Sequence, residues 1–207
     1  MSAEAVIIAG GRGTRMGTLG EGLPKALLPV AGRPLLDYSL NLLRKYSITN
    51  VVICTGYLGE QIEHHVGNGS KWGLQVRYSR ESIPLGTAGC LRAIDPMPSA
   101  DFLVLYADLL IEMDLQSLLQ THRSSQADGT LVVHPNDHPF DSDLVALDYP
   151  TTNILGIHKK PHAADLCLPN LVSAALYVLK PSLLDLLIPG EKADCAHDLF
   201  PRALKTG

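Results

Sequence analysis

Short apolar runs alternate with helical patterns through residues 1–128, and this alternation restricts the fold more than any other feature. The apolar runs have the composition of strands and lie at 5–8, 50–54, 74–78 and 102–106. The helical patterns lie at about 34–45, at about 58–66, directly after Gly86, and at about 114–122. Parallel strands need crossovers of this kind, and the helices then cover both faces of the sheet. The sequence predicts an α/β fold with a mostly parallel mixed sheet flanked by helices.

From Gly129 onward, strands and turns replace the helical crossovers. The expected strands lie at 130–134, 143–147, 154–158 and 171–179, and helical signals return near Ser182 and His197. We expect one domain over 1–207 with two halves, 1–128 and 129–207, the second packed as a lobe on the first. Ligands of open α/β sheets bind beyond the carboxyl ends of the strands, so the loops after Ile8, Cys54 and Tyr106 should hold the site.

Composition excludes several classes of function. The net charge is −4 and no basic run occurs, which argues against nucleic-acid binding because a phosphate backbone requires clustered Lys and Arg. No stretch approaches the ~20 apolar residues that cross a bilayer. The 4 cysteines are far apart, and the N-terminus has no secretory pattern. These features predict a soluble protein of the reducing cytoplasm.

The loop after the first strand reads Gly10-Gly11-Arg12-Gly13-Thr14-Arg15. Glycines let a backbone approach a phosphate chain and point its N–H groups at it, and the arginines add positive charge. The loop is therefore interpreted as an anion-binding cradle, with an ordinary glycine-rich turn as the alternative. It is neither a P-loop, which needs Gly-Lys-Ser/Thr, nor a dinucleotide fingerprint, which needs a further glycine.

A single lysine, Lys25, lies in an apolar stretch between Pro24 and Pro29. Proline fixes the backbone angle φ and stiffens a loop, so we expect Lys25 to be held in place rather than to move freely in solvent. A fixed ammonium group suits neutralisation of charge at a phosphorus atom. For this segment alone, a surface lysine near a turn is the alternative interpretation.

Taken together, GGRGTRM and LPKALLPVAGRP resemble the paired signature of the sugar-phosphate nucleotidyltransferases, GGxGTRL followed by PKxLLPV. LGTAG, at 85–89, resembles the base-contacting loop of that family, and Tyr106-Ala107-Asp108 stands at the place of its Gly-Asp metal motif. The resemblance implies a Rossmann-like, GT-A-like nucleotidyltransferase fold that joins a nucleoside monophosphate from an NTP to a sugar 1-phosphate. It also implies that 1–128 binds the nucleotide and 129–207 the sugar.

The resemblance assigns roles to individual residues. Those implied to bind the nucleotide are Ala9, Gly10, Gly11, Gly13, Thr14, Arg15, Gly86, Thr87 and Ala88. Arg15 is expected to stabilise the departing pyrophosphate, and Lys25 the pentacoordinate α-phosphorus. Asp108 is expected to hold Mg²⁺ between protein and phosphate oxygens, with a turn or helix cap as its alternative role.

Within the family, the chain is most similar to the D-glycero-D-manno-heptose 1-phosphate guanylyltransferases, including forms fused to a phosphatase of the haloacid dehalogenase class. The stretches behind this likeness are LPKALLPVAGRP, LGTAG and the run from His134 to Val145. It favours GTP and either that heptose phosphate or mannose 1-phosphate as substrates. A C-terminal phosphatase domain or a homo-oligomer is the partner arrangement it suggests.

The sugar half departs from the family pattern. Lys159-Lys160-Pro161 stands where Glu-Lys-Pro is usual, and Ser173 and Ala175 replace Asn and Gly. Sugar contacts are expected from Lys160, Asn170 and Ser173, although Asn170 after Pro169 equally fits a turn. These departures keep open the alternative of a non-catalytic nucleotide-sugar sensor. A transferase acting on a non-sugar phosphate, such as a polyol or amino-alcohol phosphate, is a further alternative because it shares the first motif.

Members of the family usually carry a second metal-binding carboxylate, and this sequence has none at the expected place. The Asp-x-Gly-Thr-Pro-like segment of these members does not occur after Leu171, so we expect the native polypeptide to continue past Gly207, or the chain to be a fragment whose metal site is one ligand short. Asp198 is expected to begin a helix rather than to bind metal. The paired histidines of 134–138 and 158–162 are interrupted by prolines, which argues against a zinc-binding helix.

Overall fold

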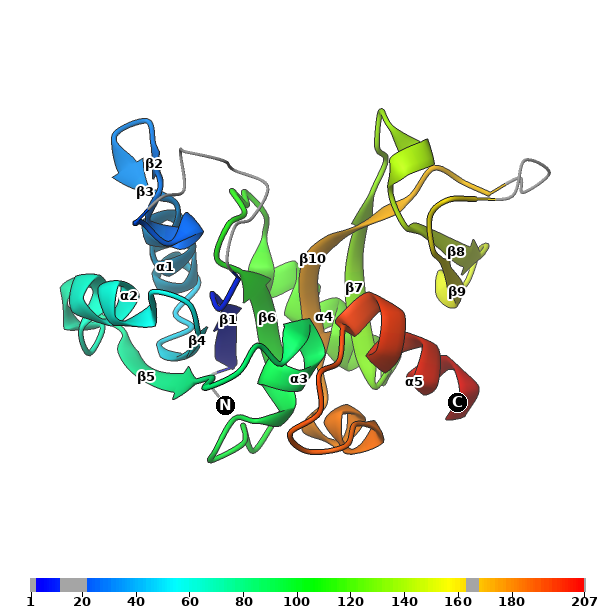
Figure 1. Ribbon diagram of the computed structural model, residues 1–207. Helices are drawn as coiled ribbons and strands as arrows, with labels where there is room; N and C mark the ends of the chain where they lie inside the picture. The colour runs from blue at the N-terminus through cyan, green and yellow to red at the C-terminus, as the bar shows by residue number, and fades with distance from the viewer. Residues whose placement is uncertain (1–2, 12–21, 163–167, 207) are drawn as a thin grey trace.

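A computed structural model of the protein describes residues 3–11, 22–162 and 168–206. Its centre is a six-stranded sheet in the order β5-β4-β1-β6-β10-β7 (Figure 1). The strands of this sheet are β1 (Glu4–Ile8), β4 (Asn50–Thr55), β5 (Gln75–Arg80), β6 (Phe102–Tyr106), β7 (Gly129–His134) and β10 (Val172–Leu179). The first four are parallel, and β10 is antiparallel to both β6 and β7. The predicted mostly parallel mixed sheet is confirmed.

The central strands are buried on both faces, as their continuous apolar runs require. In β1 the side chains of Ala5 and Ile7 join one apolar cluster and that of Val6 joins the other. β6 alternates in the same way, with Leu103 and Leu105 on one face and Val104 on the other. All of these side chains are 0% exposed, so the sheet forms the middle layer of the fold.

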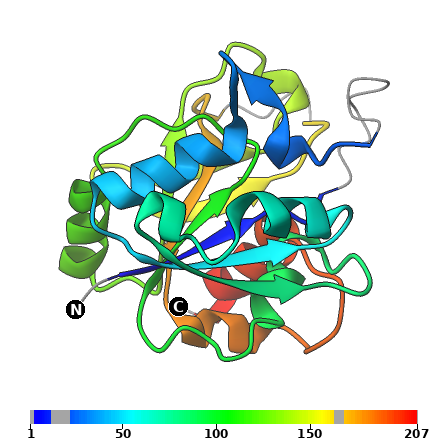
Figure 2. The same cartoon turned by 90° about the vertical axis from the view of Figure 1, so that its left-hand side faces the viewer.

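Helices cover both faces, which the quarter-turned view makes visible (Figure 2). On one face the cluster includes apolar side chains of α1 (Leu35–Lys45), α2 (Gly59–Val66) and α4 (Leu115–Ser125). On the other face it includes those of α3 (Gly86–Arg92), α5 (Phe200–Thr206) and the 3-10 helix Pro181–Leu186. No helix among the described residues is long and apolar enough to span a membrane.

The second half shares the sheet of the first. β7 and β10 continue the central sheet beyond β6, while β8 (Leu144–Asp148) and β9 (Asn153–His158) form a separate two-stranded sheet. β2 (Pro29–Val30) and β3 (Arg33–Pro34) form a second small ribbon. The register between β10 and β7 shifts between Ser173 and Tyr177, and Ala175 there has φ of 53°. Residues 129–207 are thus tied to the first half through one sheet, with the β8–β9 hairpin projecting from it.

The prediction that Asp198 begins a helix was wrong. Asp194 is the capping residue: its carboxylate accepts the N–H groups of Ala196 and His197 at the start of the π-helical turn Cys195–Leu199. Asp198 lies within that turn and accepts the N–H of Asp194 at 2.8 Å. Either aspartate could serve as a cap by type, and the position nearer to the first free N–H groups does so.

Candidate active site

The carboxyl ends of three central strands meet at one edge of the sheet. Ile8 at the end of β1 is level with Cys54 of β4 and Tyr106 of β6. The pairing runs one residue further, because the N–H of Ala9 donates to Cys54 O at 2.8 Å and that of Ala107 to Ile8 O at 3.0 Å. The three loops predicted to hold the site therefore leave the sheet side by side.

Lys25 is held in a short 3-10 helix, Lys25–Leu27, as the flanking prolines predict. The N–H of Leu27 donates to Pro24 O at 2.8 Å, and the side chain of Ala26 is only 3% exposed. This anchored turn directs the Lys25 ammonium to the carboxylate of Asp108, with which it forms an ion pair. The side chains are 39% and 31% exposed, so the pair is open to a ligand from solvent.

The glycine-rich cradle is described only in part. Ala9 is buried and Gly10 is half-buried, while Gly11 is exposed at the edge of the sheet. Arg12, Gly13, Thr14 and Arg15 lie outside the described residues, so their predicted roles stay predictions.

Glu81 is a site residue that sequence reasoning missed. It follows β5, and its Oε2 would lie 2.8 Å from a Cβ placed on Gly10 and 3.3 Å from one placed on Gly56, so the small residues make room for this carboxylate. Among the described residues none bonds to its buried Oε1. Burial raises the pKa of the Glu81 carboxyl, and the N–H of Leu85 offsets part of that effect. Its place four residues before LGTAG was the only signal in the sequence.

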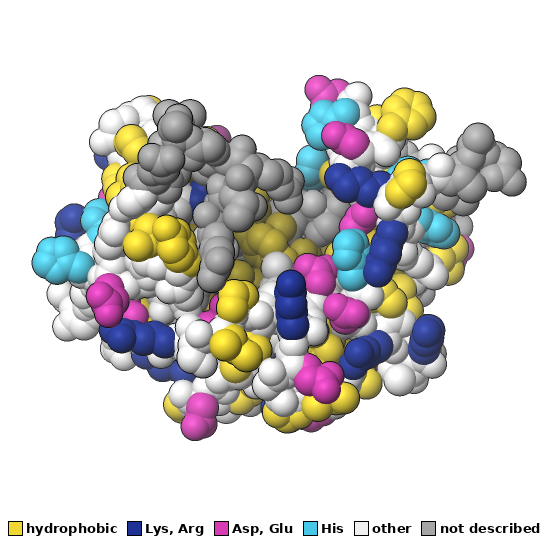
Figure 3. Space-filling model, viewed as in Figure 1, with side chains coloured by type: hydrophobic (Ala, Val, Ile, Leu, Met, Phe, Trp, Pro, Cys, Tyr) yellow, Lys and Arg dark blue, Asp and Glu magenta, His cyan; other side chains and the backbone are white. Residues whose placement is uncertain are grey.

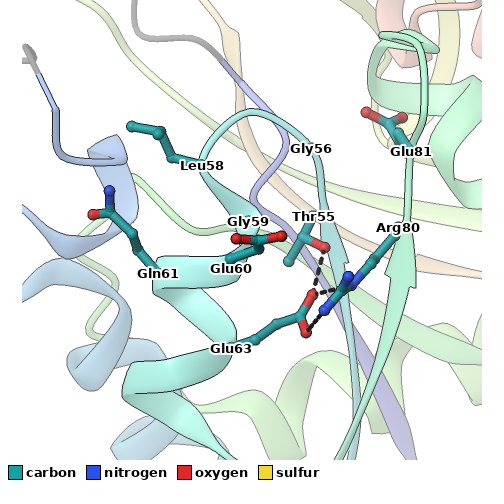
Figure 4. A pocket seen from close by; sticks show the side chains of 9 residues that line it. All are labelled: Thr55, Gly56, Leu58, Gly59, Glu60, Gln61, Glu63, Arg80 and Glu81. Carbon is teal, nitrogen blue, oxygen red and sulfur yellow. Dashed lines mark hydrogen bonds and ion pairs between the residues drawn. The ribbon is translucent and has the colours of Figure 1, made fainter.

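A cavity of about 390 Å³ lies beside Glu81, at the ends of β4 and β5 and the start of α2. Figure 4 shows Arg80 and Glu63 pointing toward each other across its wall, with Thr55 beside them. Thr55 Oγ1 donates to Glu63 at 3.4 Å, and Arg80 makes a two-pronged contact with the same carboxylate. These polar groups satisfy one another, whereas the buried Oε1 of Glu81 has no partner among the described residues.

The LGTAG stretch begins α3, and most of it faces the protein interior. The side chain of Ala88 is 0% exposed and its N–H donates to Ala193 O at 2.9 Å. Thr87 Oγ1 donates to Asp194 Oδ2 at 2.8 Å. Gly86 is half-buried at the start of the helix. As nucleotide ligands, all three residues stay predictions.

The three residues predicted to contact the sugar are bonded within the protein. Asn170 exchanges hydrogen bonds with the backbone of Asn136. The Lys160 N–H donates to Asp143 Oδ1 at 3.1 Å, and its ammonium group donates to Asp141 O. Ser173 Oγ donates to Tyr177 at 3.3 Å. The structure thus gathers Lys160 and Asn170 around the loop 134–143 and leaves Ser173 inside β10.

Asp108 fits the role of a magnesium ligand in its chemistry. Mg²⁺ binds through one or two carboxylates and completes its shell with water and substrate phosphates, so a half-exposed carboxylate at the cradle suffices. No group of three or more His, Cys, Asp or Glu side chains that could hold a metal occurs among the described residues. Of the later carboxylates, Asp185 pairs with Arg92, and Asp194 and Asp198 take part in helix capping.

The nucleotidyl transferase family model matches residues 4–207, almost the whole chain. The chain belongs to this family. Its curated relatives include a mannose-1-phosphate guanylyltransferase of Mycobacterium tuberculosis, 30% identical over 99% of the chain and 56% of the relative. A UTP–glucose-1-phosphate uridylyltransferase of Synechocystis is 29% identical, with the same two coverages. The chain thus spans about half the length of these relatives.

Solved structures of nucleotidyltransferases share the fold. One is a putative glucose-1-phosphate thymidylyltransferase from Bacillus anthracis, with a TM-score of 0.86 and 20% identity over 99% of this chain and 84% of that one. Another is HddC from Yersinia pseudotuberculosis complexed with GMP-PN, with a TM-score of 0.78 and 21% identity over 96% and 85%. The predicted nucleotidyltransferase fold is confirmed.

Proposed function

We propose that this chain transfers a nucleotidyl group from an NTP, preferentially GTP, to a sugar 1-phosphate and releases pyrophosphate. The observation that carries the proposal is the meeting of Lys25 and Asp108 at the carboxyl edge of the sheet, beside Gly10 and Gly11. An ammonium group, a carboxylate and a glycine cradle at one edge are the parts that a charged phosphoryl-type transfer requires.

The reaction is an exchange at the α-phosphorus. An oxygen of the sugar phosphate attacks this atom, the bond to the bridging oxygen of the β-phosphate breaks, and pyrophosphate leaves. Lys25 is suited to stabilise the negative charge that gathers on the α-phosphate oxygens, and Arg15 the charge on the leaving group. Asp108 would hold Mg²⁺, which supplies charge neutralisation at the phosphates when bound. The Lys25–Asp108 pair must separate as phosphate oxygens arrive.

Glu81 supports guanine as the preferred base. The Watson–Crick edge of guanine presents two adjacent N–H donors, at N1 and N2, and a carboxylate can accept both. Uracil and thymine instead present one N–H between two carbonyl oxygens, which a carboxylate repels. The Glu81 carboxylate has Oε2 beside Gly10 and Gly56, and its Oε1 has no partner among the described residues, so it suits guanine better than a pyrimidine.

The acceptor we propose is mannose 1-phosphate or D-glycero-D-manno-heptose 1-phosphate. Guanylyltransferases for mannose 1-phosphate are among the relatives of the chain. The heptose phosphate is supported by the resemblance of 134–145. A cytoplasmic location, a fused phosphatase domain and a homo-oligomer stay predictions.

A pyrophosphate-release assay tests the proposal. GTP, ATP, UTP, CTP and dTTP are each offered with Mg²⁺ and a panel of sugar 1-phosphates, together with polyol and amino-alcohol phosphates. We expect turnover with GTP and one of the two named sugar phosphates. Nucleotide binding without turnover across the panel would identify a sensor, and turnover only with a non-sugar phosphate would identify the other alternative.

Glu81→Gln tests the choice of base within the same assay. An amide can accept from only one of the guanine donors, so the ratio of kcat/KM for GTP over UTP should fall by about tenfold or more. Glu60→Gln is the matched control, because Glu60 lies on the wall of the same cavity and is exposed. An unchanged ratio in Glu81→Gln would place base recognition elsewhere.

A further inference from the structure

The stretch 85–89, here called the LGTAG loop, is hydrogen-bonded to a segment more than 100 positions further along the chain. The N–H groups of Ala88 and Gly89 donate to Ala193 O at 2.9 and 3.1 Å, and Ala193 N–H donates to Leu85 O at 2.9 Å. Gly86 has φ of +77°, and a Cβ there would lie 2.5 Å from Ala193 O. The LGTAG loop therefore takes its shape from contact with the segment 191–198.

One carboxylate fixes the only hydroxyl of the LGTAG loop. Thr87 Oγ1 donates to Asp194 Oδ2 and accepts the N–H of Cys195, both at 2.8 Å. With its hydroxyl engaged as donor and acceptor, Thr87 cannot rotate without losing two hydrogen bonds. Asp194 thus orients the first turn of α3.

The same carboxylate also caps the helical turn that follows it in the chain. Its other oxygen, Oδ1, accepts the N–H groups of Ala196 and His197 at 2.9 and 3.1 Å. The turn that this cap stabilises presents the His197 ring to Asp143 Oδ2 at 2.5 Å. The second oxygen of Asp143 accepts the N–H of Lys160 at 3.1 Å.

Asp194 therefore stands between the two halves of the site. It accepts a hydrogen bond from Thr87, in the half that precedes Gly129. It also caps the turn that carries His197, whose ring contacts Asp143, and Asp143 in turn accepts the N–H of Lys160, in the half that follows. Figure 1 shows the arrangement: the segment that leads into α5 passes α3, and α5 lies below the β8–β9 hairpin. The space-filling view shows the upper face hollowed between the part that carries α2 and the part that carries this hairpin (Figure 3).

We propose that Asp194 is a positioning residue that sets the LGTAG loop for nucleotide binding through Thr87 and the Asp143–Lys160 corner for sugar-phosphate binding through His197. The inference rests on the proposed function, and it goes beyond that function by naming the residue that aligns the two substrate regions. Both oxygens of Asp194 accept hydrogen bonds within the protein, so its removal should change the affinities for the substrates more than the rate at saturation.

Separate variants test the connection from Asp194 to Thr87 and the connection from Asp194 through His197 to Asp143. Thr87→Val keeps the shape and removes the hydroxyl, and should raise the Kd and KM for GTP by about tenfold with kcat little changed. Thr87→Ser restores the hydroxyl and should recover most of that loss. His197→Ala should raise the KM for the sugar phosphate about fivefold and leave the Kd for GTP near that of the parent.

Asp194→Ala removes the hydrogen bonds to Thr87 and to the turn that carries His197, and should raise both the Kd for GTP and the KM for the sugar phosphate. Asp128→Asn is the matched control, since Asp128 pairs with Lys180 on the surface and is 69% exposed. The Kd is measured by calorimetry with GTP and Mg²⁺, well below the melting temperature of each variant. Hydrogen–deuterium exchange of the 85–90 amides should accelerate in Thr87→Val and Asp194→Ala but not in His197→Ala.

The outcomes separate this inference from the proposed function. If the parent transfers guanylyl groups but Thr87→Val and Asp194→Ala bind GTP like the parent, Asp194 has no positioning role and only the inference fails. An equal loss of GTP affinity in Thr87→Val, His197→Ala and Asp194→Ala would also overturn it, because a general loss of packing would then explain the data. A parent that binds no nucleotide at all would overturn both. If Asp194→Ala does not fold, Thr87→Val and His197→Ala still decide.

Discussion

The parallel half of the sheet and its antiparallel extension hold their loops by different means. In β1, β4 and β6 apolar side chains are buried on both faces. Lys25 lies between β1 and β4 in the sequence, Asp108 follows β6, and Glu81 follows the edge strand β5. In β7 and β9 no residue is fully buried. There the loops are held by polar side chains that bond to one another.

The network around loop 134–143 illustrates the second arrangement. Asn136 donates to Ser142 Oγ at 2.6 Å, and the His162 ring contacts Ser142 O at 2.8 Å. Asn170 and Lys160 hold the same loop through its backbone. Where apolar burial fixes the backbone, polar side chains stay available for ligands; where burial is thin, they are used to fix the loop itself. The difference accords with Lys25 and Asp108 being partly exposed at the edge of the sheet, whereas Lys160 and Asn170 are bonded to loop 134–143.

The largest expected effect comes from Lys25→Ala in the apolar half. Loss of one charge-stabilising group at a reaction centre lowers the rate by roughly 10²- to 10³-fold, so kcat should fall by that factor while the melting temperature stays near that of the parent. Lys45→Ala, an exposed lysine at the end of α1, is the control. Turnover by Lys25→Ala within about twofold of the parent would mean that another group carries the transition-state charge.

Asp108→Asn should act on the metal dependence. The amide keeps the size of the side chain but removes the charge that attracts Mg²⁺, so the Mg²⁺ concentration for half-maximal activity should rise by about tenfold or more. Titration of Mg²⁺ at saturating GTP measures it, and Asp101→Asn serves as control because Asp101 lies before β6, at the opposite end of the strand. An unaltered titration curve would move the ligand role to another carboxylate.

Asn170→Ala sharpens the contrast between the halves. If Asn170 mainly holds loop 134–143, its loss should lower the free energy of unfolding by about 1 kcal/mol and speed the amide exchange of that loop. Chemical denaturation and hydrogen–deuterium exchange measure the two quantities, with Asn153→Ala as an exposed control on β9. A raised sugar-phosphate KM together with unchanged stability and exchange would instead support the predicted direct contact.

The smallest effect near neutral pH concerns the buried groups beneath the LGTAG loop. Burial raises the pKa of Tyr177 to about 12 and that of Cys195 to about 12, and it also raises the pKa of Tyr106. In the unfolded chain these groups lose their protons at pH ~8.5 (Cys) and ~10 (Tyr), which is a lower pH than in the folded protein. The contribution of these groups to stability should therefore be constant below pH ~8.5 and fall as the pH rises toward 12. Tyr177→Phe should flatten part of this slope in melting curves recorded from pH 7 to 11, and an identical slope would contradict the assignment.

The positions of the elements could be predicted because they depend on local patterns. The apolar run of β1 specifies a strand buried on both faces wherever it is placed, and the prolines around Lys25 specify a stiff turn. The order of strands and helices in residues 1–128 follows from such patterns, as does the edge at which the three loops emerge. The signature around Gly10 and Lys25 then pointed to the family.

The pairings could not be predicted, because they join residues that are distant in the sequence. Lys25 meets Asp108 across 83 positions and Thr87 meets Asp194 across 107. Such contacts depend on strand order, register and the path of each crossover, which no local window contains. Asp194 and Asp198 are equivalent by residue type, and only the geometry of the turn makes the first a cap. Apolar patterning determined the sheet, whereas tertiary packing decided which polar side chains meet at its edge and which are used in holding a loop, because a polar group takes its role from the partner within hydrogen-bonding distance.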